Sequence, residues 1–178
     1  MMRPAWKVRR RWPKRLCPGF SFSLPADGPA TVILDTNILL ELWLSEPSDH
    51  VKPLHAALHD NTVQWLATQA MRVELERVLA YPHIAARLAG SAERFLGRFD
   101  ALARVLPAAA RAPFRCRDAD DQKFVDLAAA HPGSQLISHD REVLALRSRM
   151  ARVGVAVGDA FPARLPSEGG FVHSGGPF

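Results

Sequence analysis

Residues 31–37 read Thr-Val-Ile-Leu-Asp-Thr-Asn, an apolar and β-branched run that ends directly in a carboxylate. A short continuous apolar run of this kind is typical of a strand that is buried on both faces of a parallel sheet. In an open parallel sheet, ligands bind beyond the carboxyl ends of the strands. Asp35 therefore stands where we expect a functional side chain, although an Asp at this point also commonly caps the following helix.

The rest of the chain alternates short apolar runs with helical patterns, which is typical of an α/β domain. Further strands are predicted near residues 63–66, 105, 135–138 and 153–157. Helices are predicted at about 38–44, 48–60, 68–81, 91–106, 118–130 and 141–151. Thr68 is expected to cap the third of these helices, and Pro82 is expected to stop it. The sequence thus predicts one domain over residues 31–162, with a central parallel sheet between helices.

The formal net charge of +5 is distributed unevenly along the 178 residues. Residues 1–30 hold seven Lys or Arg and one Asp, whereas residues 31–178 hold sixteen basic and seventeen acidic groups. Five of the 14 prolines also fall in residues 1–30, so we expect a basic, irregular or disordered extension there. Residues 163–178 are rich in Gly, Ser and Pro and are expected to form a second irregular tail.

Composition excludes several classes of protein. No apolar run approaches the roughly 20 residues that a membrane-spanning helix needs, so no membrane association is expected. The two cysteines, Cys17 and Cys116, are too few for a disulfide framework or a Cys-rich zinc site, so a cytoplasmic location is expected. Gly-rich motifs of the phosphate-cradling and dinucleotide-binding kinds do not occur, so neither nucleotide hydrolysis nor cofactor-dependent redox chemistry is indicated.

Three carboxylates, Asp118, Asp120 and Asp121, stand at the start of the predicted helix 118–130. Asp118 as N-cap with Asp121 three residues later resembles a capping box. Capping does not explain all three, because crowded like charges raise the cost of ionising each other. On a helix that begins at Asp118, Asp121 shares a face with the apolar Phe124, so we expect Asp121 to point inward.

Two more acidic residues complete the pattern. Asp140 comes just after the predicted strand 135–138. Glu74 lies nearer than Glu76 to the apolar stripe of its predicted helix, although a solvated Glu on a helix flank is the commoner case. Inward carboxylates from separate elements are costly unless cations compensate them, and oxygen-only ligation is the preference of Mg²⁺ or Mn²⁺. Without the six acids singled out, residues 31–178 would sum to +5, so the acids lie in a basic background that suits a phosphodiester substrate.

Four motifs occur in an order that resembles the PIN domain. They are Leu-Asp-Thr-Asn at 34–37, Glu-Leu-Glu-Arg-Val-Leu at 74–79, Cys-Arg-Asp-Ala-Asp-Asp-Gln-Lys-Phe at 116–124 and Leu-Ile-Ser-His-Asp at 136–140. The resemblance covers about residues 31–162 and is greatest to the bacterial subgroup of toxin components of toxin–antitoxin systems, related to VapC-type ribonucleases. It implies a three-layer α/β/α fold.

The resemblance also implies a metal-dependent endoribonuclease that uses one or two Mg²⁺ or Mn²⁺ ions. The residues implied to be both catalytic and metal-binding are Asp35, Glu74, Asp121 and Asp140. Asp118 and Asp120 match an acidic run that holds metal through water, and Asn37 is implied to orient Asp35. Ser138 keeps the hydroxyl that the family has at this position, whereas His139 departs from the family pattern.

Two other functions remain open at this point. The chain could be a non-catalytic RNA-binding or regulatory module on the same fold, although all four acidic positions are filled. It could also be a structure-specific DNA nuclease. The resemblance implies RNA as the substrate, an antitoxin protein as a partner, and the formation of a homodimer.

Overall fold

The computed structural model describes residues 29–44, 46–88 and 92–162. The basic extension is predicted over residues 1–30, of which 1–28 lie outside these ranges, and the predicted C-terminal tail, residues 163–178, lies outside them as well. The first described strand begins at Ala30, one residue before the predicted start of the domain.

A five-stranded parallel sheet forms the centre of the molecule, as predicted. Its strands are β1 (Ala30–Leu34), β2 (Val63–Thr68), β3 (Ala103–Leu106), β4 (Gln135–Ile137) and β5 (Ala156–Gly158). They lie in the order β3-β2-β1-β4-β5. The chain therefore adds strands on one side of β1, crosses back, and adds the last two on the other side. The boundary between β1 and β4 is the topological switch point, where open α/β sheets bind their ligands.

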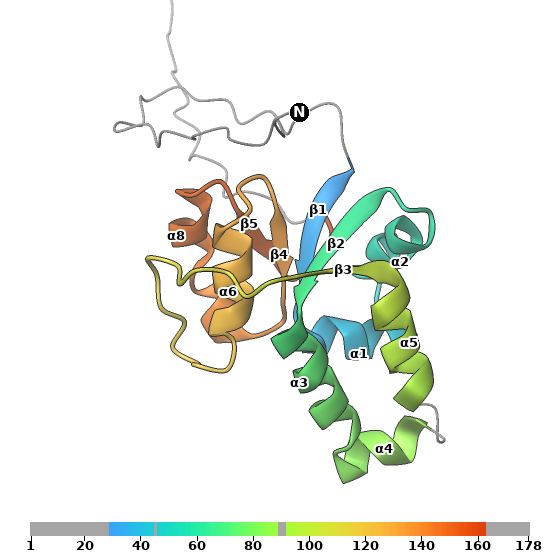
Figure 1. The fold of residues 1–178 in the computed structure, drawn as a ribbon. Helices are drawn as coiled ribbons and strands as arrows, with labels where there is room; N and C mark the ends of the chain where they lie inside the picture. The colour runs from blue at the N-terminus through green and yellow to red at the C-terminus, as the bar shows by residue number, and fades with distance from the viewer. Residues whose placement is uncertain (1–28, 45, 89–91, 163–178) are drawn as a thin grey trace, which may run out of the picture.

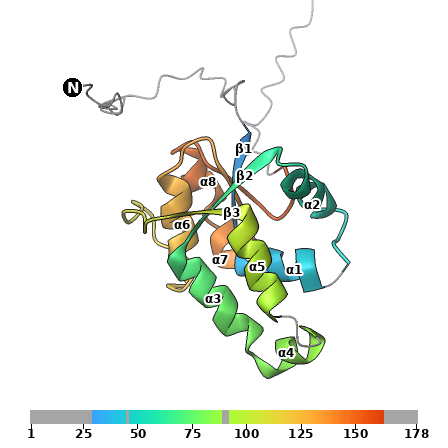
Figure 2. The ribbon, with the colours of Figure 1, turned by 45° about the vertical axis from the view of Figure 1, so that its right-hand side comes forward.

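Helices flank this sheet and give the predicted three-layer α/β/α fold. They are α1 (Thr36–Leu44), α2 (Lys52–His59), α3 (Gln69–Leu79), α4 (Pro82–Leu88), α5 (Ala92–Leu102), α6 (Gln122–Ala129), α7 (Arg141–Leu144) and α8 (Arg147–Ala151). Helix α6 contacts β1 and β4, and α2 contacts β2; Figure 2 shows α6 and α2 on opposite sides of the sheet. Helix α3 leaves the carboxyl end of β2 and, with α4, extends beyond the sheet (Figure 1).

The core is built from the strands and from the apolar stripes of the helices. Val32, Ile33 and Leu34 of β1 are fully buried, as the continuous apolar run predicts. Trp65 of β2 packs edge-on against Phe99 of α5, with ring centroids 4.9 Å apart. Such aromatic pairs contribute about 0.5–1.5 kcal/mol beyond the burial of their area. The Trp65–Phe99 pair fixes α5 against the sheet, and α5 leads directly into β3.

No helix within the described ranges is long and apolar enough to span a bilayer.

The predicted start of the helix that carries the acidic run is wrong. The helix predicted from Asp118 begins at Gln122, with Asp121 as its N-cap residue. Asp118 instead caps a turn, because its Oδ1 accepts a hydrogen bond from the backbone N–H of Asp120 at 2.8 Å. The helical phase that we used to orient Asp121 therefore does not apply to it.

Proline has a second role that the sequence analysis missed. Helix α3 ends at Leu79, before Pro82 as expected, but Pro82 is also the first residue of α4. Proline suits this position because the first N–H groups of a helix have no partner within the helix. The helix predicted over residues 141–151 is likewise two short helices, α7 and α8, separated by a turn at residues 145–146.

Candidate active site

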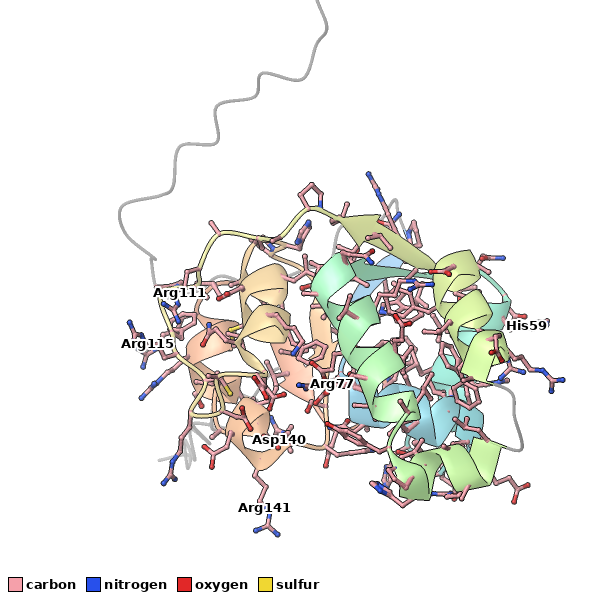
Figure 3. The ribbon with its side chains drawn as sticks, turned by 60° about the horizontal axis from the view of Figure 1, so that its bottom comes forward. His59, Arg77, Arg111, Arg115, Asp140 and Arg141 are labelled. Carbon is pink, nitrogen blue, oxygen red and sulfur yellow. The ribbon has the colours of Figure 1, made fainter. Side chains whose placement is uncertain are left out.

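The carboxyl ends of β1 and β4 lie side by side and carry two of the predicted acids. Leu34 pairs with Ile137, and the next residue, Asp35, donates its backbone N–H to the Ile137 carbonyl at 3.1 Å. Asp140 follows three residues after β4 ends. Figure 3 looks toward this edge of the molecule and shows Asp140 there. The two acids therefore stand at the switch point of the sheet.

Asp35 is buried and held by two side-chain donors. It is only 3% exposed. Its Oδ2 accepts hydrogen bonds from Ser138 Oγ at 2.5 Å and from Asn37 Nδ2 at 2.7 Å. Burial raises the pKa of Asp35 above its usual value, and the nearby charge of Glu74 raises it further, whereas the two hydrogen bonds act in the opposite direction. The two donors fix the orientation of a carboxylate that burial would otherwise penalise.

Asp140 caps α7 as well as lying at the site. Its Oδ1 accepts hydrogen bonds from the backbone N–H groups of Glu142 and Val143 at 2.7 and 3.3 Å. The capping role that could have explained this residue by itself is therefore present. Its backbone N–H donates to Ser138 Oγ at 2.9 Å, so Asp140 is also tied to the end of β4.

Glu74 reaches the site from α3. Its side chain is 14% exposed, whereas that of Glu76 is 61% exposed. Its Oε1 accepts a hydrogen bond from Thr36 Oγ1 at 2.8 Å, and its Oε2 forms an ion pair with the ammonium of Lys123. Thr36 is the first residue of α1, so this contact joins α3 to the turn that follows β1.

Asp121 stands just before α6, and its side chain has neither a hydrogen bond nor an ion pair with any described residue. Its pKa is raised to about 7. Burial is the largest cause, followed by the charges of Asp35, Asp140 and Asp118, while Lys123 acts in the opposite direction. Because such effects require proximity, the structure brings Asp121 together with the acids of β1 and β4. The turn before α6 achieves this placement, rather than the helix face that we predicted.

The remaining predicted residues lie at the edge of this group. Asp118 and Asp120 are both exposed. The charge of Asp118 acts on Asp121, so Asp118 is close to the centre. His139, which departs from the family pattern, is exposed and places its Nε2 2.5 Å from Glu41 Oε2 of α1.

Sequence reasoning missed two residues that contact Glu74. Lys123 lies two positions after Asp121, and Thr36 lies directly after Asp35. Their nearness in sequence to predicted acids was a usable signal. The contacts themselves depend on α3 packing against α1 and α6, which no local pattern reveals.

The four acids supply the type of donor atom, carboxylate oxygen, that a hard divalent cation prefers. They offer carboxylate oxygens from four separate parts of the chain, and burial together with the charges of the neighbouring acids raises the pKa of Asp121. As the side chains stand, no three Asp, Glu, His or Cys groups among the described residues are close enough to hold one ion. Binding would therefore require carboxylate side chains to change rotamer.

Comparison with known proteins supports the family resemblance. A sequence model described as the PIN domain matches residues 31–142, which is more than half of the chain. The matched range contains all four acids. A search of curated proteins finds no match to the chain.

Proposed function

This chain belongs to the PIN domain family, and on that premise we propose that it is a metal-dependent endoribonuclease that hydrolyses RNA phosphodiesters. PIN domains are in general metal-dependent nucleases. The observation that supports the proposal is that acids from separate parts of the chain lie near one another at the switch point: the charge of Glu74 acts on Asp35, and the charges of Asp35 and Asp140 act on Asp121. The choice of RNA rests on the likeness of the four motifs to those of the ribonuclease toxins.

We assign the four acids to the binding of Mg²⁺ or Mn²⁺. Bound at these acids, such an ion would supply the activation of a water molecule for attack on the phosphorus and the stabilisation of charge on the reacting oxygens. In this proposal Asp118 and Asp120 contribute through water molecules. No side chain is required as the nucleophile.

The protein's own contribution is orientation. Ser138 and Asn37 hold one oxygen of Asp35, the N-terminus of α7 holds one oxygen of Asp140, and Thr36 holds one oxygen of Glu74. Each acid except Asp121 thus has a fixed donor on one side. Partners that orient a ligand in this way commonly affect metal affinity or activity by about 10–100-fold.

Basic side chains near this edge could bind the substrate's phosphates. Figure 3 shows Arg77 of α3 and Arg141 of α7 on the same face of the molecule as Asp140. Both side chains are exposed, and neither forms an ion pair with another residue in the part of the chain that the structure describes. Arginine without an internal partner is available for phosphate, which it binds in a bidentate manner.

The direct test compares Asp35→Asn with the wild type in cleavage of single-stranded RNA by the purified full chain. We expect Mn²⁺ or Mg²⁺ to be required, products with 5′-phosphate and 3′-hydroxyl ends, and a loss of at least about a hundredfold in the variant. Asp49→Asn is the matched control, because Asp49 is exposed and pairs with Lys52 far from the site. Cleavage that survives in Asp35→Asn would refute the proposal.

The same preparation separates the alternatives. Salt-sensitive RNA binding without metal-dependent turnover would indicate a binding module. Preferential cleavage of DNA flaps or duplexes over RNA would indicate a structure-specific DNA nuclease.

We further propose that the chain is the toxin of a toxin–antitoxin module, with an antitoxin that covers the acidic site through a basic segment, and that it forms a homodimer. Induced expression should arrest growth, and Asp35→Asn should abolish the arrest. Sedimentation of the pure chain tests the homodimer.

A further inference from the structure

Lys123 places a positive charge inside the group of acids. It is the second residue of α6, and its side chain is 21% exposed. Its ammonium pairs with Glu74 Oε2 and also donates to the backbone carbonyl of Asp120. It lies over the ring of Phe124, 4.7 Å from the centroid. Three kinds of contact therefore hold this ammonium in place.

The pairing leaves Glu74 in a different state from Asp121. Both oxygens of Glu74 have a partner, since Oε1 bonds to Thr36 and Oε2 pairs with Lys123. The side chain of Asp121 has no hydrogen bond or ion pair with any residue in the described ranges. The ammonium of Lys123 therefore compensates the charge of Glu74. The negative charges of Asp121, of Asp35 after β1 and of Asp140 before α7 have no such cation among the described residues.

We propose that Lys123 is a built-in counter-ion that takes the place of a second metal ion at Glu74, so that the site binds a single divalent ion through Asp35, Asp121 and Asp140. This inference rests on the proposed function, because it assumes that these acids bind metal.

Charge and position both support this assignment. Four ionised carboxylates carry four negative charges, and two divalent ions together with the ammonium would supply five positive ones, so a second ion would overcompensate the group. A second ion on Glu74 Oε2 would have to share that oxygen with Lys123, and like charges at contact distance repel strongly. The ammonium cannot easily withdraw, because α3 and α6 pack against each other and the ammonium itself lies over the ring of the buried Phe124.

The test counts the ions that the full chain binds. Mn²⁺ is titrated into the metal-free protein, and free Mn²⁺ is followed by electron paramagnetic resonance. We expect one ion per chain for the wild type and for Lys123→Arg, which keeps the charge. We expect two ions for Lys123→Met, which keeps the apolar stem but removes the charge. Lys52→Met is the matched control, because Lys52 pairs with Asp49 on the exposed surface; it should bind one ion.

A double variant shows where the second ion binds. Adding Glu74→Gln to Lys123→Met should return the count to one, because the second ion would lose its carboxylate. Circular dichroism checks that each variant is folded, and Lys123→Gln replaces Lys123→Met if the latter is not.

Two ions bound by the wild type would overturn the inference, and so would a single ion bound by the folded Lys123→Met or Lys123→Gln variant. Absence of any Mn²⁺ binding by the wild type is a different result, since it would refute the metal-dependent function itself.

Discussion

Ser138 donates a hydrogen bond from its Oγ to Asp35 Oδ2 at 2.5 Å and accepts one from the backbone N–H of Asp140 at 2.9 Å. One buried hydroxyl therefore connects the acid that follows β1 with the acid that follows β4. The two acids are 105 positions apart in the sequence. The Ser138 hydroxyl helps to fix the position of Asp35 relative to Asp140 across the switch point.

Removing that hydroxyl should damage catalysis more than folding. We expect Ser138→Ala to lower kcat/KM for RNA by about 10–100-fold, because Asp35 loses a donor that orients it. The free energy of unfolding should fall by about 1–3 kcal/mol, since the buried Asp35 carboxylate loses a partner. Ser138→Thr keeps the hydroxyl and should retain most of the activity. Ser148→Ala, at an exposed position on α8, is the control, and equal activity in both alanine variants would contradict the assignment.

The raised pKa of Asp121 makes the stability of the metal-free protein depend on pH. A carboxyl with a pKa of about 7 in the folded chain and 3.8 as its ordinary value binds a proton on folding. Its contribution to stability is complete below the ordinary pKa and is lost as pH rises through about 7. In the presence of a chelator, the melting temperature should therefore fall between about pH 5 and about pH 8.

Asp121→Asn should flatten this pH dependence and raise the melting temperature at the higher pH, because the amide remains neutral. Part of the slope should remain, since the pKa of Asp35 is also raised. Asp159→Asn, an exposed position, should leave the slope unchanged. A wild-type melting temperature that rises over this pH range would show that Asp121 is not held as the structure places it.

The amide side chain of Gln122 makes several contacts that hold the segment between β3 and α6, which Asp126 also binds at Ala112. Gln122 is 7% exposed, its Oε1 accepts from the Cys116 backbone N–H at 2.7 Å, and its Nε2 donates to the Phe114 carbonyl and to Asp126. We expect Gln122→Ala to lower the free energy of unfolding by about 2–3 kcal/mol, because buried groups lose their partners. Urea denaturation measures this loss, and the exposed Gln69→Ala should lose far less.

Loosening that segment should also affect the site, because it ends in Asp121. Limited proteolysis of Gln122→Ala should show new cleavage within residues 107–121. If this range stays resistant while stability falls, Gln122 supports the core and does not hold the segment.

The exposed arginines should contribute to RNA affinity through charge. In an Asp35→Asn background, which prevents cleavage, Arg77→Ala and Arg141→Ala should each weaken RNA binding and reduce the slope of log affinity against log salt by about 1. Arg94→Ala is the control, because Arg94 is exposed on α5 and forms no ion pair with the described residues. An unchanged salt slope in both site variants would remove these residues from the proposed phosphate contacts.

Much of the fold follows from local patterns in the sequence. The apolar runs of β1, β2 and β4 predicted buried strands, because burial on both faces leaves a continuous apolar signal. Strand order did not follow from them, since it depends on which strands pair across the chain. The placement of β1 next to β4, which makes the site, became visible only in the structure.

The acidic run 118–121 shows why the site was only partly predictable. An Asp three residues before another acid is a good N-cap signal, and we placed the helix start at Asp118. The start lies at Gln122 instead, because the Gln122 side chain bonds back to the preceding segment and Asp118 closes a turn. Asp121 still lies near the other acids, but the turn before α6 places it there, and the periodicity of a helix cannot predict such a turn. The Lys123–Glu74 pair depends on two rotamers from helices 49 positions apart in the sequence, so no spacing rule could predict it.

The two ends of strand β1 lie at opposite edges of the sheet. Ala30 lies at one end and Asp35 follows the other; five residues at about 3.3 Å each separate these edges by about 16 Å. The basic segment of residues 1–28 is therefore joined at the edge opposite the acids. A substrate phosphate held at the acids would therefore lie about 16 Å or more from the residue at which that segment joins the sheet.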